Sequence, residues 1–234
     1  MKTKVLFLSL LLIGLFTITT ANAEEEKRNV AAFSEISLRI SGNLYLTQGD
    51  KQDVRIEATP STLDDIITEV KGSKLIIRFP NKSFFKRNFK PGKIDIFITV
   101  PDVDALSVSG SGDIIAKELK SRILNLAVSG SGDIEIGNLD SKRVKSSVSG
   151  SGNIKIGNGG VADELTISIS GSGNFKGSGF EAEDVTVSTA GSGNCNVKSN
   201  GTIKARIAGS GSVYYKGNPG VDASIAGSGK VREM

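Results

Sequence analysis

The chain has 234 residues, of which 38% are hydrophobic and 23% are charged, and its formal net charge is +4. This nearly neutral balance gives no general reason to expect a nucleic-acid partner. The single cysteine excludes an internal disulfide, and the lack of histidine removes the commonest general base and metal ligand. We therefore expect no metal, no cofactor, and a fold that depends on packing and backbone hydrogen bonds.

The first 23 residues are typical of a secretory signal peptide. Lys2 and Lys4 precede an apolar run at 5–16, and Ala21 and Ala23 occupy the small-residue positions of a cleavage site. The run is shorter than the roughly 20 apolar residues that a spanning helix needs, and an uncleaved membrane anchor is the alternative. We predict cleavage after Ala23, and export to the periplasm, the outer membrane or the exterior. We expect no transmembrane span in the mature chain.

The mature chain begins with residues 24–32, which we expect to be short and flexible, and continues as a single domain at 33–234. Residues 30–105 form its divergent, strand-rich part. The segment SLRISGNLYLTQG at 37–49 has the layout of the later repeats without their second corner glycine, which indicates an early, divergent coil. In TPSTLDDIITEV, Thr62 is a candidate N-cap, and the spacing predicts one short turn of helix.

The segment PNKSFFKRNFKPGK at 80–93 is the most unusual loop of the chain. It mixes basic and aromatic side chains, which suit contact with a membrane surface, an anionic polymer or a partner protein. The alternative is a hairpin extension whose phenylalanines pack back on the sheet while its lysines are solvated. The candidate binding residues in this loop are Phe84, Phe85, Lys86, Arg87 and Phe89.

Residues 106–234 consist of a repeat in which Gly-Ser-Gly begins at residues 110, 130, 150, 171, 191, 209 and 227. Apolar residues alternate with polar ones on both sides of each Gly-Ser-Gly, as at Leu124, Leu126 and Val128 and again at Ile134 and Ile136. A repeat of about 20 residues without a helical period fits one coil of a β-helix. Glycines then form stacked corners, because glycine tolerates positive φ and close backbone approach. The sequence predicts an all-β solenoid with a strand-rich N-terminal cap.

The residues that directly follow the corners form a second candidate site. In a stacked solenoid they lie above one another, and their side chains can hydrogen-bond from coil to coil as a ladder. A structural ladder is the favoured interpretation, and a cation or glycan site built on Asp113 and Asp133 is the alternative. The ladder residues are Asp113, Asp133, Asn153, Asn174 and Asn194.

Catalysis has little support in the sequence, and we predict no catalytic residues. The carboxylate pairs Asp64–Asp65 and Asp102–Asp104 are of a kind that any chain with 25 acidic residues offers. Cys195 aligns in the repeat with Ile134, Ile154 and Phe175, which are inward-facing positions. This alignment predicts a buried and inert thiol, because a reactive cysteine needs exposure and a lowered pKa.

The repeats SGSGDI, SGSGNI and SGSGNF, preceded by ITVPDVDALSV, resemble the head GIN domain of putative auto-transporter adhesins. This family occurs in secreted and envelope proteins of Bacteroidetes-type bacteria. The resemblance covers residues 33–215 and implies a right-handed β-helix-like fold, with no established activity and no binding residues to carry over.

We therefore expect an exported, non-enzymatic binding or adhesion module of the cell envelope, with an extended glycan or an envelope or host protein as its partner. One alternative is a polysaccharide-active enzyme on the same scaffold. Another is a structural envelope subunit that docks through residues 80–93 or through an open end of the solenoid. Carboxylates clustered with lysine or arginine in a groove would favour the enzyme, whereas a flat face of Ser, Asn and Thr would favour binding or a structural role.

Overall fold

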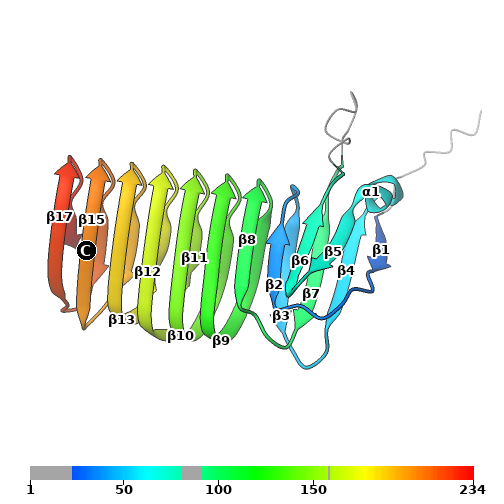
Figure 1. The fold of residues 1–234 in the computed structure, drawn as a ribbon, viewed down its shortest axis with the longest axis horizontal. Helices are drawn as coiled ribbons and strands as arrows, with labels where there is room; N and C mark the ends of the chain where they lie inside the picture. Colours follow the sequence, from blue (N-terminus) through cyan, green and yellow to red (C-terminus); the bar gives the residue numbers. More distant parts are fainter. Residues whose placement is uncertain (1–22, 81–90, 158) are drawn as a thin grey trace, which may run out of the picture.

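The computed structural model describes residues 23–80, 91–157 and 159–234 as a right-handed β-solenoid, which confirms the predicted fold class (Figure 1). The N-terminal part contains β1 (Glu24–Lys27), β2 (Glu35–Leu38), β3 (Asn43–Gln48), β4 (Asp53–Ala58), α1 (Pro60–Asp65), β5 (Ile67–Lys71), β6 (Lys74–Arg78) and β7 (Asp95–Val100). The regular part contains β8 (Ala105–Gly110), β9 (Asp113–Gly130), β10 (Ile134–Gly150), β11 (Ile154–Ile156), β12 (Val161–Gly171), β13 (Phe175–Gly191), β14 (Cys195–Lys198), β15 (Thr202–Gly209), β16 (Val213–Lys216), β17 (Gly220–Gly227) and β18 (Val231–Glu233). The one helix among these residues, α1, is too short to cross a membrane.

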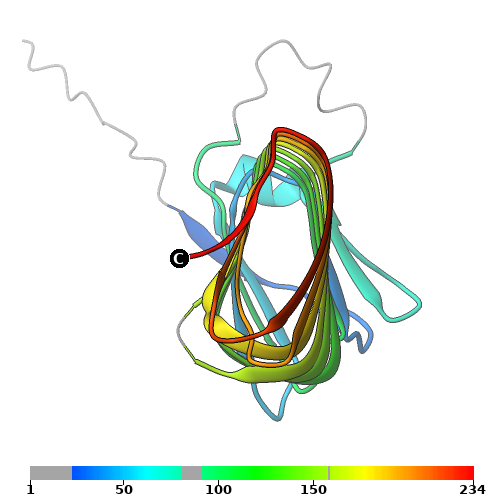
Figure 2. The same cartoon turned by 90° about the vertical axis from the view of Figure 1, so that its left-hand side faces the viewer.

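Successive coils of the regular part pair in parallel, so that equivalent residues of the repeat lie side by side. Ile134 of β10, for example, is the neighbour of Ile114 in β9 and of Ile154 in β11. Viewed along the solenoid, the coils superimpose as a flattened ring with two long sides (Figure 2). Residues on the same side of successive repeats therefore form columns that run along the solenoid.

The Gly-Ser-Gly corners need their glycines for two different reasons. The first glycine of every corner, Gly150 among them, has φ between 127° and 141°, where side chains other than glycine are strained. The second glycine lies against the preceding coil of the chain, and a Cβ at Gly152 would be 2.1 Å from the carbonyl oxygen of Gly132. Both roles were predicted from the sequence, and both follow from stacking corners on one another.

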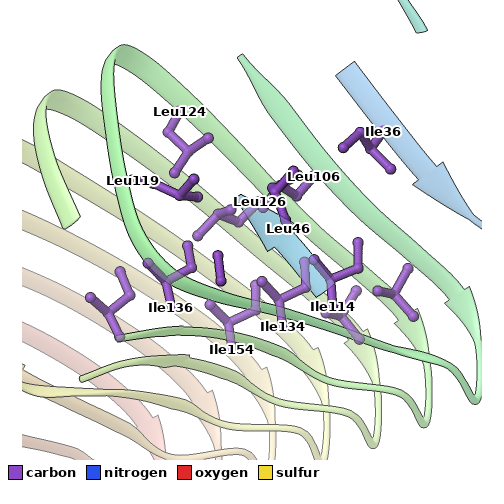
Figure 3. Packing of buried hydrophobic residues seen from close by; sticks show 14 of the residues in the cluster. Ile36, Leu46, Leu106, Ile114, Leu119, Leu124, Leu126, Ile134, Ile136 and Ile154 are labelled. Atoms are coloured by element: carbon purple, nitrogen blue, oxygen red, sulfur yellow. The ribbon is translucent and has the colours of Figure 1, made fainter. Parts of the chain in front are cut away.

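The core fills the space between the two long sides of the coils. Inward-facing columns such as Ile114, Ile134 and Ile154 are completely buried, and they stack from coil to coil (Figure 3). Cys195 lies in the same column next to Phe175 and is also completely buried. Its burial was predicted from the repeat, and burial raises the pKa of the thiol, which favours the expected lack of reactivity.

The predicted early coil is formed by β2 and β3, but it does not lie at the end of the solenoid. β2 pairs in parallel with both β6 and β8, and β3 pairs in parallel with both β7 and β9. The coil of β2 and β3 is therefore inserted between the coil of β6 and β7 and the first regular coil. Beyond β7, the antiparallel strands β4 and β1 extend the sheet, and the antiparallel strand β5 covers the edge of β6.

Two details of the N-terminal part differ from the predictions. Within residues 24–32, which were expected to be flexible, Glu24–Lys27 pairs with β4 as strand β1, and Lys27 forms an ion pair with Asp53. Thr62 as N-cap was wrong, because α1 begins at Pro60 with Thr59 as its N-cap. The hydroxyl of Thr62 instead donates to the carbonyl oxygen of Pro91 at 2.7 Å.

Candidate functional site

Residues 81–90 of the aromatic and basic loop lie outside the described residues. Phe84, Phe85, Lys86, Arg87 and Phe89 all fall within 81–90, so their binding role stays a prediction.

The ladder predicted after the corners is present as a continuous chain of hydrogen bonds. The carboxylate of Asp113 accepts from the backbone N–H of Asp133 at 2.8 Å, and the carboxylate of Asp133 accepts from the backbone N–H of Asn153 at 2.7 Å. The side-chain amide of Asn174 donates to Asn153 Oδ1 at 2.9 Å, and Asn174 Oδ1 accepts from the backbone N–H of Asn194 at 3.0 Å. Each side chain thus ties its own coil to a neighbouring one.

The ladder continues beyond the five predicted residues in both directions. Asn194 Oδ1 accepts from the backbone N–H of Ser212 at 3.0 Å. In the N-terminal part, Asn43 is the neighbour of both Asp113 and Asp95, and its side-chain amide is 3.4 Å from Asp95 Oδ1. Asp95 also forms an ion pair with Lys93 at 2.7 Å, which raises the pKa of that lysine.

These contacts bear on how the ladder can be used. The side chains are half-buried, and the oxygens described above already accept hydrogen bonds from the protein itself. Among residues 23–80, 91–157 and 159–234, no group of three or more His, Cys, Asp or Glu side chains is placed to hold a metal ion. The geometry accounts for the ladder as a structural device, and ligand binding by Asp113 and Asp133 stays a prediction.

One long side of the solenoid is formed by the strands that end at the first glycine of each Gly-Ser-Gly. Its outer surface carries a grid of hydroxyl groups that we call the serine face. Its strands pair in register, so Ser147 lies beside Ser168, and Ser149 lies beside Ser170. All of its members are exposed except Ser107, which is half-buried. The serine face consists of Ser107, Ser109, Ser129, Ser147, Ser149, Thr166, Ser168, Ser170, Thr186 and Ser188.

The spacing of this grid follows from the geometry of a β-sheet. Neighbouring strands lie about 4.8 Å apart, and residues i and i+2 on one face of a strand lie about 6.7 Å apart. The serine and threonine side chains are short, and the longer side chains in the same columns are Asn125 and Lys145, and further along Lys204 and Arg206. Each hydroxyl can donate one hydrogen bond and accept others. The serine face can therefore offer regularly repeated polar contacts to a ligand that lies along it.

The opposite long side of the solenoid is chemically different. Near its N-terminal end the rings of Tyr45 and Phe97 stack with centroids 5.3 Å apart, and the guanidinium of Arg55 lies 5.5 Å from the centroid of Phe97. Further along, Lys155 forms an ion pair with Glu135. This side therefore carries charged and aromatic groups in place of the hydroxyl grid.

The described surface gives little support for catalysis. A depression of about 440 Å³ is lined by Leu46, Thr47, Gln48, Lys117, Glu118 and Lys120, and Glu118 is the single carboxylate among them. Asp102 and Asp104 are exposed beside Pro101, and Asp64 and Asp65 are the last two residues of α1. None of these residues forms a carboxylate pair within a groove, which is the arrangement that would favour a polysaccharide-active enzyme.

Sequence reasoning identified the ladder but missed the serine face and the pair of Tyr45 and Phe97. The signal for the serine face was present, because the polar positions between the apolar ones are Ser or Thr in several consecutive repeats. The aromatic pair had no such signal, since its two residues come from β3 and β7, which become neighbours only in the folded sheet.

Residues 32–219 match the family described as "putative auto-transporter adhesin, head GIN domain". Among solved structures, a putative adhesin from Bacteroides fragilis is 26% identical, with a TM-score of 0.85, and the match covers 91% of this chain and 97% of that one. A putative lipid binding protein from Parabacteroides distasonis is 24% identical, with a TM-score of 0.74 and coverages of 92% and 98%. A putative adhesin from Parabacteroides merdae is 20% identical, with a TM-score of 0.72 and coverages of 92% and 97%. No curated protein matches the chain.

Proposed function

Because the chain belongs to the family of the head GIN domain of putative auto-transporter adhesins, we propose that it is an exported, non-enzymatic binding module of the cell envelope. We propose further that the serine face is its recognition surface and that an extended polysaccharide is its ligand. The observation that carries this proposal is the flat, regularly spaced grid of hydroxyl groups. Export is supported by the signal-peptide pattern at 1–23 and the predicted cleavage after Ala23.

The chemistry of the serine face favours a polymer over a small molecule. Small ligands usually bind in concave pockets that bury most of their surface, whereas this face is flat. A polymer with repeated hydroxyl groups can form the same weak contact on several coils, and these contacts act together because they are linked. The stacked coils hold the hydroxyls in place before the ligand binds, which reduces the entropy lost on binding.

The test is a binding screen of the mature chain, residues 24–234, against arrays of polysaccharides and matrix proteins. A variant with Ser147, Ser149, Ser168 and Ser170 all changed to Ala removes four hydroxyls without altering the shape of the face. Each hydrogen bond contributes about 0.5–1.5 kcal/mol, so the loss of four predicts an affinity at least about tenfold weaker. The matched control carries four alanines on the opposite side, at Glu135, Lys155, Lys176 and Asn196.

The outcomes separate the alternatives. A polysaccharide whose binding is weakened by the serine variant and not by the control supports the proposal. A ligand lost only in the control, in a variant with Asp113 and Asp133 changed to Ala, or in a deletion of residues 82–90 would place the binding surface elsewhere. The absence of any ligand would favour a structural role in the envelope. Sequencing the N-terminus of the exported protein tests the cleavage site, and a first residue other than Glu24 would contradict it.

A further inference from the structure

The two ends of the solenoid are finished in different ways. At the N-terminal end, α1 and the antiparallel strands β1, β4 and β5 lie beyond the stacked coils (Figure 1). At the other end, β17 pairs with β15 alone and β18 pairs with β16 alone, among the strands that the structure describes. Repeat proteins normally need a terminal unit with a polar outer surface, and neither β17 nor β18 forms such a unit over the last described coil.

The last coil exposes side chains that the preceding coils bury. Val221 and Ile225 are 41% and 42% exposed, although their neighbours in β15, Ile203 and Ile207, are 0% and 3% exposed. Every residue of β17 is exposed. The end of the solenoid therefore presents apolar core residues together with an unpaired strand.

The unpaired edge of β17 has a defined set of free backbone groups. The N–H of Gly220 donates back to the carbonyl oxygen of Gly201 at 2.8 Å. Backbone hydrogen bonds alternate sides along a strand. The odd-numbered residues Val221, Ala223 and Ile225 therefore direct their N–H and C=O groups away from β15, beyond the last coil. Natural edge strands are protected by lysine, proline or inward-pointing charges. Within β17 the only charged side chain is Asp222, which lies on the outer face of the sheet and not in the core.

The sequence of β17 is complementary to itself in the antiparallel direction. With Ala223 opposite its own copy, Val221 lies opposite Ile225 and both face the core. In the same register Asp222 lies opposite Ser224 on the outer face, so no like charges meet. The odd-numbered residues form three pairs in this register: Val221 with Ile225, Ala223 with Ala223, and Ile225 with Val221. In each pair the free N–H and C=O groups of the two residues point at each other, as hydrogen-bonded antiparallel pairs require.

We propose that the C-terminal end of the solenoid binds a second copy of the chain, through antiparallel pairing of β17 with β17 of the copy about a two-fold axis at Ala223. The last coil, residues 217–234, supplies 18 residues, which is close to the roughly 20–30 residues that each partner contributes to a stable interface. The pairing covers Val221 and Ile225 and joins the cores of the two solenoids. The resulting dimer is twice as long and carries a serine face on each half.

The test is sedimentation velocity of the mature chain, residues 24–234, over about 1–100 µM, a range that detects micromolar dissociation constants. The wild-type chain is expected to sediment as a dimer. Ala223→Pro removes an N–H that points away from β15 and leaves the hydrogen bonds to β15 in place. Ile225→Asp places a charge among the apolar side chains at the end of the solenoid. Each substitution should weaken dimerisation at least tenfold. The matched control Ala226→Asp carries the same charge on the outer face, opposite Gly220, and should remain dimeric.

Disulfide trapping tests the register without relying on variants that weaken the dimer. Residues 222 and 224 form a non-hydrogen-bonded pair in the proposed register, with Cα atoms about 4.5 Å apart, which a disulfide can bridge. A mixture of Asp222→Cys and Ser224→Cys chains should therefore cross-link on oxidation, and neither variant should cross-link alone. A wild-type chain that is monomeric throughout, or a dimer that survives both Ala223→Pro and Ile225→Asp, would overturn the proposal. Thermal unfolding of each variant verifies that it is folded.

Discussion

Changing Gly152 to Ala tests whether close stacking of the corners holds the coils together. The new Cβ would lie 2.1 Å from the carbonyl oxygen of Gly132 and 2.6 Å from Val128 Cγ1. A carbon–oxygen contact is normally about 3.3 Å or longer, so the two coils must separate locally by about 1 Å. The backbone N–H groups of Ser151 and Gly152 both donate to Gly130 O at 2.9 Å, and these bonds would lengthen beyond their useful range.

The cost can be estimated from these contacts. The bond from the Asn153 N–H to the Asp133 carboxylate, 2.7 Å long, lies next to the corner and would be lost with the other two. Three hydrogen bonds at about 1 kcal/mol each, together with the lost packing contacts beneath the corner, predict a decrease of about 3–5 kcal/mol in the free energy of unfolding.

Urea denaturation followed by circular dichroism measures this decrease. The matched control is Gly72→Ala, because Gly72 has φ +63° and a Cβ there would meet no atom within 4 Å. That variant should lose only the cost of a left-handed backbone, about 1–2 kcal/mol. If Gly152→Ala were no less stable than Gly72→Ala, close stacking of the corners would not be what holds the coils together.

Three further predictions concern the interior and the ladder. Thr189→Val replaces a buried hydroxyl that has no hydrogen-bond partner by a methyl of similar size, and it should raise the free energy of unfolding in urea by about 1 kcal/mol; a decrease would contradict this. Asn174→Ala removes the acceptor of the Asn194 N–H and the donor to Asn153. The free energy of unfolding in urea should therefore decrease by about 1–2 kcal/mol. No decrease would mean that water satisfies these two groups as well as the Asn174 side chain does. Burial raises the pKa of the Cys195 thiol, so the thiol stabilises the fold fully below its unfolded pKa of about 8.5, and this stability decreases by about 1.4 kcal/mol per pH unit above it. Urea titrations between about pH 9 and 10.5 should therefore show a shallower pH dependence for Cys195→Ala than for the wild type, and equal slopes would contradict the assignment.

The regular part of the fold could be predicted because its information is local. The Gly-Ser-Gly spacing placed every corner, and the alternation around Leu126 and Ile134 identified which side chains are buried. Stacking in register then follows, since each coil repeats the one before it. For the same reason the ladder after the corners was found residue by residue, including its bonds from coil to coil.

The parts that could not be predicted depend on contacts between distant segments. The layout of 37–49 aligns Asn43 with the ladder residues, but nothing in the sequence indicates that it lies between Asp95 and Asp113, because this requires β3 to be inserted between β7 and β9. The helix start was misplaced at Thr62, whose hydroxyl is used by a contact with Pro91. The serine face was overlooked because its residues are individually ordinary, and only their alignment in neighbouring coils makes a surface.

The insertion of β2 and β3 between later strands determines the order in which the solenoid can be assembled. β6 and β7 must return to one edge of the β2–β3 coil, and β8 and β9 must then pair with its other edge. These contacts join residues up to 72 positions apart, as between Gln48 and Lys120, and closing such loops is slow. Each later coil pairs with one that precedes it by only 18 to 21 residues, so it can add to a surface that already exists. The rate-limiting step of folding should therefore lie in the first half of the chain, with the remaining coils adding rapidly in sequence towards the C-terminus.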